Sequence, residues 1–156
     1  MKPVRTAHTI TVDRSRDEVF ALLDDLSAHE RWTDHFLVDW HVDGPARGVG
    51  ATARFRAKGA GPNAKATIEV IESSPERIVE EGRGGKGGRR RTRGTYELRP
   101  LPSGGTEVTF ISEVVEPANR LEALANPMSR AYLNRNNARA MERLQALLAA
   151  PARTAA

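Results

Sequence analysis

The order of periodic segments along the chain limits the possible folds more than any single motif does. Residues 9–12 alternate polar and apolar side chains, the period of a half-buried strand, and residues 15–18 form a capping box that begins a helix. Alternating segments and glycine-rich turns follow, and an amphipathic helix over residues 127–149 closes the pattern. Antiparallel strands need an apolar element against their concave face. Only this last helix, roughly 34 Å long at about 1.5 Å per residue, is long enough to cover one.

Two short helices and about six strands are expected before that final helix. Ser27 can cap a second helical turn that ends near Trp32. On the next strand, residues 36–43, His41 is expected to point to solvent. The residues of that strand expected to face the core are Phe36, Val38, Trp40 and Val42. Further strands are expected over residues 51–58, 64–71 and 78–81, around Tyr96 and Leu98, and over 108–114.

This order resembles the helix-grip arrangement of the START-like (SRPBCC) superfamily, in which a curved antiparallel sheet of about six to seven strands wraps around a long C-terminal helix. The opening residues are similar to the signature of its polyketide cyclase/dehydrase branch, where a capped helix is followed by Asp24, Asp25, a turn and Trp32. Residues 72–77, 104–108 and 115–117 resemble later parts of the same pattern. The resemblance implies an α+β fold. Because the superfamily includes cyclases, aromatases, lipid and hormone carriers, quinone-binding proteins and chaperone cofactors, it defines fold more narrowly than function.

Small side chains on two neighbouring strands favour an internal hollow. Four alanines lie on the strand faces that are expected to meet the final helix, and they leave volume that leucine or isoleucine would fill. They are Ala53, Ala57, Ala64 and Ala66, on the same side as Phe55 and Ile68. We therefore expect a mostly apolar cavity between sheet and helix, of the roughly 300 to 1,000 Å³ typical of ligand sites.

The ligand-binding residues predicted for this cavity are mostly aromatic. Large aromatic side chains are also ordinary core residues, so each of them has that second interpretation. Asn137 interrupts the apolar stripe of the final helix, and it is either a ligand contact or a structural amide bonded to backbone. The predicted set is Trp32, Phe36, Trp40, Phe55, Ile68, Tyr96, Phe110, Met128, Tyr132 and Asn137.

Tyr96, Tyr132 and His35 are the candidate catalytic residues. Either phenol could donate a hydrogen bond to a carbonyl oxygen and stabilise an enolate during an aldol-type ring closure, although a phenol at a cavity rim more often contacts water. His29 and His35 flank Trp32 and could act as acid or base. No carboxylate is positioned by the sequence to orient them, which favours surface loop positions for both.

Positive charge is concentrated in one glycine-rich segment. Six of the 24 basic residues fall there with no acidic residue among them, and the remaining 18 face 20 acidic residues elsewhere. The segment is expected to be a mobile, solvated hairpin that could attract an acidic protein, an anionic membrane surface or RNA. It lacks the aromatic rings and the ordered helix of nucleic-acid readers, so sequence-specific binding to nucleic acid is not expected. Its basic residues are Arg83, Lys86, Arg89, Arg90, Arg91 and Arg93.

Composition argues against several chemistries and compartments. The chain has no cysteine and four histidines, so disulfides, thiolate catalysis and a metal site are not expected, and no cofactor is implied. No run approaches the roughly 20 apolar residues of a transmembrane segment, and the N-terminus lacks the apolar stretch of a signal peptide. We expect one cytoplasmic ligand-binding domain over residues 1–150, with a disordered tail over residues 151–156.

Two functions fit these observations. The first is binding of a bulky hydrophobic small molecule of polyketide, lipid or quinone type, with a cyclase or dehydrase activity that folds a reactive chain and polarises a carbonyl group. The alternative is a noncatalytic carrier or ligand-responsive protein that docks an acidic protein partner through the basic hairpin. An enzyme needs an acid and a base within reach of one substrate atom, whereas a carrier needs only shape and one or two anchors.

Overall fold

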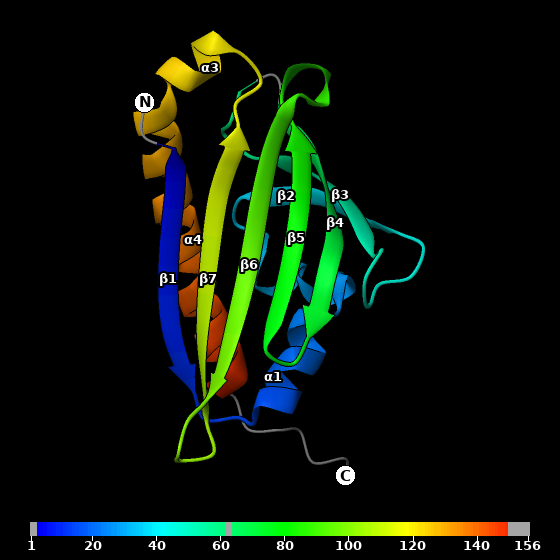
Figure 1. Cartoon of the computed structure of the whole chain (residues 1–156), viewed down its shortest axis with the longest axis vertical. Helices are drawn as coiled ribbons and strands as arrows, with labels where there is room; N and C mark the ends of the chain where they lie inside the picture. The colour runs from blue at the N-terminus through cyan, green and yellow to red at the C-terminus, as the bar shows by residue number, and fades with distance from the viewer. Residues whose placement is uncertain (1–2, 62–63, 150–156) are drawn as a thin grey trace.

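The first and last strands of the chain pair with each other at one edge of a single sheet (Figure 1). The computed structural model describes residues 3–61 and 64–149. Its antiparallel sheet has seven strands in the order β1-β7-β6-β5-β4-β3-β2, which confirms the expected α+β helix-grip architecture. The strands are β1 (Val4–Val12), β2 (Leu37–Asp43), β3 (Thr52–Ala57), β4 (Lys65–Ser74), β5 (Arg77–Gly84), β6 (Arg90–Pro100) and β7 (Thr106–Glu116).

Short helices occupy the connections, and one long helix follows the sheet. Ser15 begins the first of them as predicted, because its Oγ accepts a hydrogen bond from the Glu18 backbone amide at 3.3 Å. The cap of the next turn differs: the Asp25 carboxylate, not the Ser27 hydroxyl, accepts the capping bond, from the Ser27 amide at 3.0 Å. The helices are α1 (Arg16–Leu23), η1 (Leu26–Ala28), α2 (Glu30–Thr33), η2 (Lys86–Gly88), α3 (Arg120–Leu124) and α4 (Asn126–Ala149).

A bulge in β2 reverses the facing that simple alternation predicts for its first half. Leu37 packs against the core, while Val38 lies on the outer side of the sheet. The register with β3 then shifts between Val38 and His41, where Asp39 has a φ of 55°. Beyond the bulge, Trp40 packs against the core as predicted. The predicted core position of Val38 is wrong because the extra residue of a bulge exchanges the two faces of a strand.

The apolar core lies under one half of the inner face, the face of the sheet that α4 covers. The C-terminal half of α4 buries Ala140, Met141, Leu144 and Leu148. These four side chains belong to one cluster with buried residues of α1, α2 and the sheet: Val19, Leu23, Trp32, Ile10, Val12, Leu98 and Val108. Burial of this stripe fixes the helix against the sheet.

The N-terminal half of α4 is much less buried. Between Met128 and Asn136 every side chain is exposed or half-buried, and Asn137 is the first fully buried residue of the helix. The helix backbone runs closest to β1 (Figure 1). On the same half of the inner face, Phe55 and Ile68 also keep partly exposed side chains. The dense core therefore ends about midway along α4.

The basic segment forms a hairpin between two strands as expected, but its loop is shorter than predicted, because the flanking arginines continue β5 and β6. Only residues 85–89 connect β5 to β6, and the arginines on either side belong to those strands. Three of the arginines form ion pairs: Arg90 with Glu122, Arg91 with Glu116, and Arg93 with Glu81. The sequence does not predict two of these ion pairs, because Glu116 and Glu122 come from β7 and α3, which are distant from the segment in sequence.

Two further expectations concern the C-terminal tail and membrane-spanning helices. The disordered tail predicted for residues 151–156 lies outside the described residues. Residues 3–61 and 64–149 include no helix that combines the length and the apolar character needed to cross a membrane.

Replacing Leu144 with alanine should lower the free energy of unfolding by about 2 to 5 kcal/mol, because this side chain is fully buried beneath α4. Leu121→Ala is the matched control, since Leu121 is 77% exposed. Its truncation should change stability by less than about 0.5 kcal/mol. Urea unfolding followed by circular dichroism measures both variants, and equal losses would contradict the assigned core.

Candidate functional site

Three glycines leave bare backbone in the middle of the inner face, on the half of the sheet nearer α3. Gly82 and Gly84 lie on β5, and Gly94 lies on β6 opposite Glu80. A Cβ atom added to Gly94 would stand 3.3 Å from the Phe110 ring and 3.4 Å from Glu80 Oε2. These two side chains therefore border a stretch of sheet that has no side chain of its own.

Glu80 is a buried carboxyl group whose two oxygens have different surroundings. Its Oε2 is the oxygen next to Gly94 on the inner face. Its Oε1 lies 3.8 Å from His29 Nδ1, which is too long for a hydrogen bond. Burial raises the pKa of Glu80 to about 7, because removal from water disfavours the charged carboxylate. At neutral pH the group is divided between its acid and carboxylate forms.

His29 is a buried, uncharged neighbour of Glu80. Its Nε2 lies 2.8 Å from the Leu23 carbonyl oxygen, and because a carbonyl only accepts, Nε2 carries the proton. Burial lowers the pKa of His29 to about 4, although the Leu23 hydrogen bond opposes the shift. Nδ1 therefore presents a lone pair toward Glu80. The surface loop position predicted for His29 is wrong, because the packing of α2 against the sheet encloses this side chain.

Aromatic rings line the inner face beside Glu80 and His29. Trp40 stacks on Phe55 with ring centroids 5.2 Å apart, and Tyr96 lies 4.5 Å from Phe110. The Trp40 indole donates to the Leu26 carbonyl oxygen at 2.9 Å, which fixes its orientation. Burial, together with the nearby charge of Glu80, raises the pKa of Tyr96 far above its usual range. The phenol therefore stays protonated, and its buried position differs from the solvent contact expected at a cavity rim.

Four buried polar atoms near this surface form no hydrogen bond with any described residue. They are Thr6 Oγ1, His8 Nε2, Glu80 Oε1 and Asn137 Nδ2. Thr6 and His8 alternate on β1 with exposed neighbours, and Asn137 lies on the α4 stripe that continues into the core. An unsatisfied buried polar group costs about 1 to 3 kcal/mol. We call these four residues, with Gly82, Gly84 and Gly94, the inner-face site.

The predicted ligand-binding residues fall into four groups. Trp32, Phe36 and Tyr96 are buried members of the core. Asn137 is buried with an unpaired amide nitrogen, so the interpretation of a fully bonded structural amide does not hold for that atom. Met128 is 76% exposed and lies away from the inner face. The partly buried residues packed against the core are Trp40, Phe55, Ile68, Phe110 and Tyr132.

Two of the candidate catalytic groups already have partners within the protein. The Tyr132 hydroxyl donates to the Lys58 carbonyl oxygen at 2.7 Å. His35 Nε2 lies 3.0 Å from the Asn136 carbonyl oxygen, and Nδ1 lies 2.8 Å from Arg143 Nη1, so one nitrogen donates and the other accepts. Burial, with the Arg143 charge, lowers the pKa of His35. Neither side chain is free to exchange a proton with a ligand in this arrangement.

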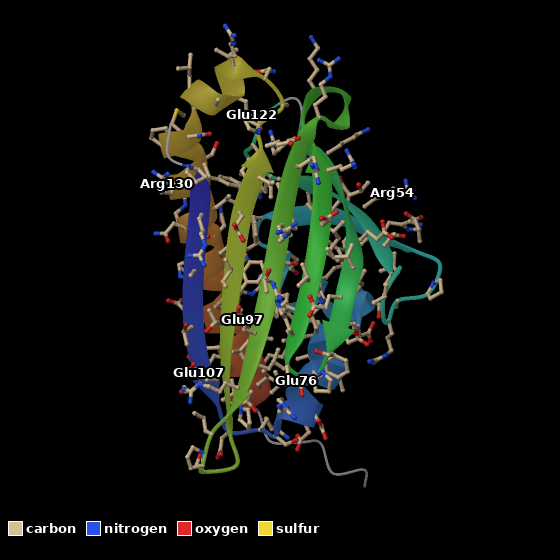
Figure 2. All side chains as sticks on the ribbon, viewed as in Figure 1. Arg54, Glu76, Glu97, Glu107, Glu122 and Arg130 are labelled. Atoms are coloured by element: carbon tan, nitrogen blue, oxygen red, sulfur yellow. The ribbon has the colours of Figure 1, made fainter. Side chains whose placement is uncertain are left out.

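Two hollows on the protein surface lie on the outer face of the sheet. One, of about 320 Å³, is lined by charged and polar side chains of β3 to β6, including Arg54 and Glu81. The other is bordered by Glu76, Glu97 and Glu107, which Figure 2 shows on the side of the sheet opposite α4. These outer-face hollows are not the enclosed apolar cavity that the alanines predict. The inner-face site is instead defined by its glycines, aromatic rings and unpaired polar atoms.

Sequence reasoning missed Glu80 and the three glycines, although a signal was present. The sequence predicts a strand at Ile78, and alternation from that residue places Glu80, Gly82 and Gly84 on the same face. A strand predicted to end at residue 81 hides this pattern, whereas β5 continues to Gly84. The positions of Thr6 and His8 required β1 to begin at Val4 and not at residue 9.

Glu80 should make stability depend on pH in a direction opposite to that of an ordinary surface carboxylate. Its pKa is raised from 4.5 to about 7, so the folded protein binds more protons than the unfolded chain between these values. Stability contributed by Glu80 should therefore fall as pH rises through this window, by about 3 kcal/mol at pH 8. His29, with its pKa lowered from 6.5 to about 4, acts in the opposite direction between those two values.

The Glu80→Gln variant isolates this effect because it keeps His29. Wild type should lose stability relative to Glu80→Gln between pH 5 and pH 8, measured by chemical unfolding at each pH. Glu81→Gln is the control, since Glu81 is the next residue of β5 and pairs with Arg93 on the outer side. A wild-type stability that parallels Glu80→Gln at every pH would refute the raised pKa.

Several proteins of known structure share this fold. The KanY protein has a similar structure, with a TM-score of 0.74 and 13% identity over 95% of this chain and 99% of that one. The Zhui aromatase/cyclase from a Streptomyces species has a TM-score of 0.72 and 18% identity over 94% of each chain. A START superfamily protein from Mycobacterium smegmatis has a TM-score of 0.66 and 13% identity, over 92% of this chain and 96% of that one.

These identities are low, and the similarities therefore concern the fold. No curated protein sequence matches the chain. A family model described as polyketide cyclase / dehydrase and lipid transport matches residues 3–149, which is nearly the whole chain. The protein therefore belongs to the polyketide cyclase/dehydrase and lipid transport family.

Proposed function

We propose that the protein binds one bulky hydrophobic small molecule that carries carbonyl or hydroxyl oxygens, in the inner-face site between the sheet and the N-terminal half of α4. The observation that carries this proposal is the set of buried polar atoms without partners on Thr6, His8 and Asn137, together with the Glu80 carboxyl group, whose Oε2 faces the same side of the sheet. A ligand that supplied their hydrogen bonds would remove the cost of leaving them unpaired. Membership of a family that includes lipid transport supports the same class of ligand.

The chemistry of the anchors favours oxygen atoms on the ligand. Asn137 Nδ2 is a donor, Thr6 Oγ1 donates or accepts, and Glu80 donates in its acid form. Carbonyl groups are pure acceptors and match these donors, whereas the stacked Trp40 and Phe55 rings favour a flat apolar body. Polyketides and quinones combine both properties, and a simple alkyl chain supplies only the second.

A dehydrase reaction on that ligand is the second candidate function, and the pKa of Glu80 near neutrality favours it. In its acid form Glu80 can protonate a departing hydroxyl group, which leaves as water while a carbon–carbon double bond forms. The resulting carboxylate can accept the proton lost from the adjacent carbon, which restores the acid. One residue then serves as both acid and base.

The positions of His8 and His29 relative to Glu80 favour ligand binding over catalysis by a paired acid and base. His8 lies on β1 and Glu80 on β5, and β7 and β6 separate them in the sheet. Strands stand about 4.8 Å apart, so the two backbones are separated by roughly 14 Å. No described contact brings the His8 and Glu80 side chains together, so the structure does not assemble them as an acid and base pair. His29 is closer to Glu80, but it is enclosed by protein.

Quenching of the fluorescence of the two tryptophans, Trp32 and Trp40, tests the binding proposal. The probe is 1,8-dihydroxyanthraquinone, a flat molecule with carbonyl and hydroxyl oxygens. Asn137→Leu should weaken its binding about tenfold, the value of one lost hydrogen bond to a buried donor. Asn134→Leu is the matched control, because Asn134 is exposed on the same helix. Equal affinity of Asn137→Leu and wild type would remove Asn137 from the site.

Comparison of two Glu80 variants separates binding from catalysis. Glu80→Gln keeps a hydrogen-bond donor but cannot exchange a proton, so it should bind the probe within about twofold of wild type. Glu80→Leu removes the donor and should bind about tenfold more weakly. Mass spectrometry of a ligand recovered from the protein would show loss of water with wild type and none with Glu80→Gln. Equal loss with both would exclude Glu80 as the proton donor.

A further inference from the structure

The end of the molecule formed by α3 and the start of α4 exposes three large apolar side chains. Leu121 is 77% exposed, Leu124 is 72% exposed and Met128 is 76% exposed. Leu121 and Leu124 lie three residues apart on α3, and Met128 lies in the first turn of α4, just beyond the break at Ala125. Large apolar side chains gathered on one exposed face indicate contact with another body.

The same end carries cations without ion-pair partners. Lys86 and Arg89 in the η2 turn and Arg120 at the start of α3 are exposed, and none forms an ion pair with a described residue. The neighbouring acids are already neutralised, since Glu116 pairs with Arg91 and Glu122 with Arg90. The net charge of this end is therefore positive.

Direct contacts hold η2 and α3 side by side. Arg90, just after η2, pairs with Glu122 of α3. A Cβ atom added to Gly85 would stand 3.2 Å from Ala118 Cβ and 3.3 Å from Glu122 Oε2, so the turn lies against the connection from β7 to α3. Figure 1 shows both elements at one end of the sheet, and Figure 2 shows Glu122 between them. The apolar and cationic residues therefore belong to one surface.

We propose that this surface, made of Lys86, Arg89, Arg120, Leu121, Leu124 and Met128, docks the protein onto an anionic lipid membrane. An amphipathic element with exposed leucines and adjacent cations inserts its apolar side chains at the lipid headgroup boundary, while the cations contact anionic headgroups. The apolar side chains project from a helical tip and do not line a groove. A stable protein complex needs about 800 Å² from each partner, whereas insertion into lipid needs only a few projecting side chains.

Docking in this orientation has a consequence for the inner-face site. The half of α4 that begins at this surface is the less buried half, and Asn137 is its first buried residue. The site would therefore lie on the membrane side of the core. The docking proposal does not depend on the identity of any ligand, because its surface residues are separate from the inner-face site.

Flotation with vesicles tests the proposal on the full chain. The vesicles contain phosphatidylcholine alone or phosphatidylcholine mixed with phosphatidylglycerol. Binding to the anionic vesicles should exceed binding to the neutral ones by about tenfold and should weaken as salt is raised. Equal binding to both vesicles, or no binding to either, would overturn the proposal without any variant.

Paired substitutions then locate the surface. Leu121→Asp with Leu124→Asp, and separately Lys86→Glu with Arg89→Glu, should each reduce binding to anionic vesicles by about tenfold. The controls are Val49→Asp, at another exposed apolar residue, and Arg31→Glu on α2, which should stay within about twofold of wild type. Because all of these positions are exposed, thermal unfolding should remain close to that of wild type. Controls that lose as much binding as the paired variants would contradict this location.

Polyglutamate serves as the test of an acidic protein partner. If the basic residues dock a protein, polyglutamate should bind the wild type and the two leucine substitutions equally well, while vesicles should not float the protein. That result would overturn the membrane proposal. Vesicle binding that needs both the leucines and the cations would support it.

Discussion

Unequal burial along α4 is the constraint on which the rest of the structure depends. Leu144 and its neighbours in the C-terminal half of the helix are fully packed and hold it against the sheet. The N-terminal half has no equivalent stripe, and the strands near it contribute glycine and alanine to the inner face. Apolar burial is proportional to the area removed from water, so one half of the helix stabilises the fold. The other half is the part that we propose contacts a ligand.

The electrostatics of the inner-face site follow from that arrangement. Glu80 and His29 are both removed from water, and burial shifts their pKa values in opposite directions, toward the uncharged form of each. The ring proton of His29 is on Nε2, which donates to the Leu23 carbonyl oxygen. To form a positively charged imidazolium that pairs with Glu80, His29 would have to bind a second proton on Nδ1. Burial of Glu80 among apolar and aromatic side chains therefore raises its pKa to about 7, so that a substantial part of it carries a proton at neutral pH.

Much of the fold could be predicted from the sequence because it depends on local patterns. The Ser15 cap, the alternation of β3 and β4 and the length of α4 are each encoded within a few neighbouring residues. The failures required contacts between distant residues. The bulge at Asp39, the burial of His29 and the pairing of Arg90 with Glu122 all arise from tertiary packing. Asn137 was identified in advance only because it interrupts an apolar stripe, whereas Glu80 was missed when β5 was predicted too short.

Native mass spectrometry of the protein purified from its native source tests the central claim most directly, with Gly94→Leu as the comparison. A leucine at this position would occupy the bare backbone between Phe110 and Glu80. The account predicts one hydrophobic, oxygen-bearing molecule per wild-type chain and its loss from a Gly94→Leu chain that still unfolds cooperatively. A wild-type chain without any bound molecule, or a molecule that the folded variant retains equally well, would contradict a ligand held at the inner-face site.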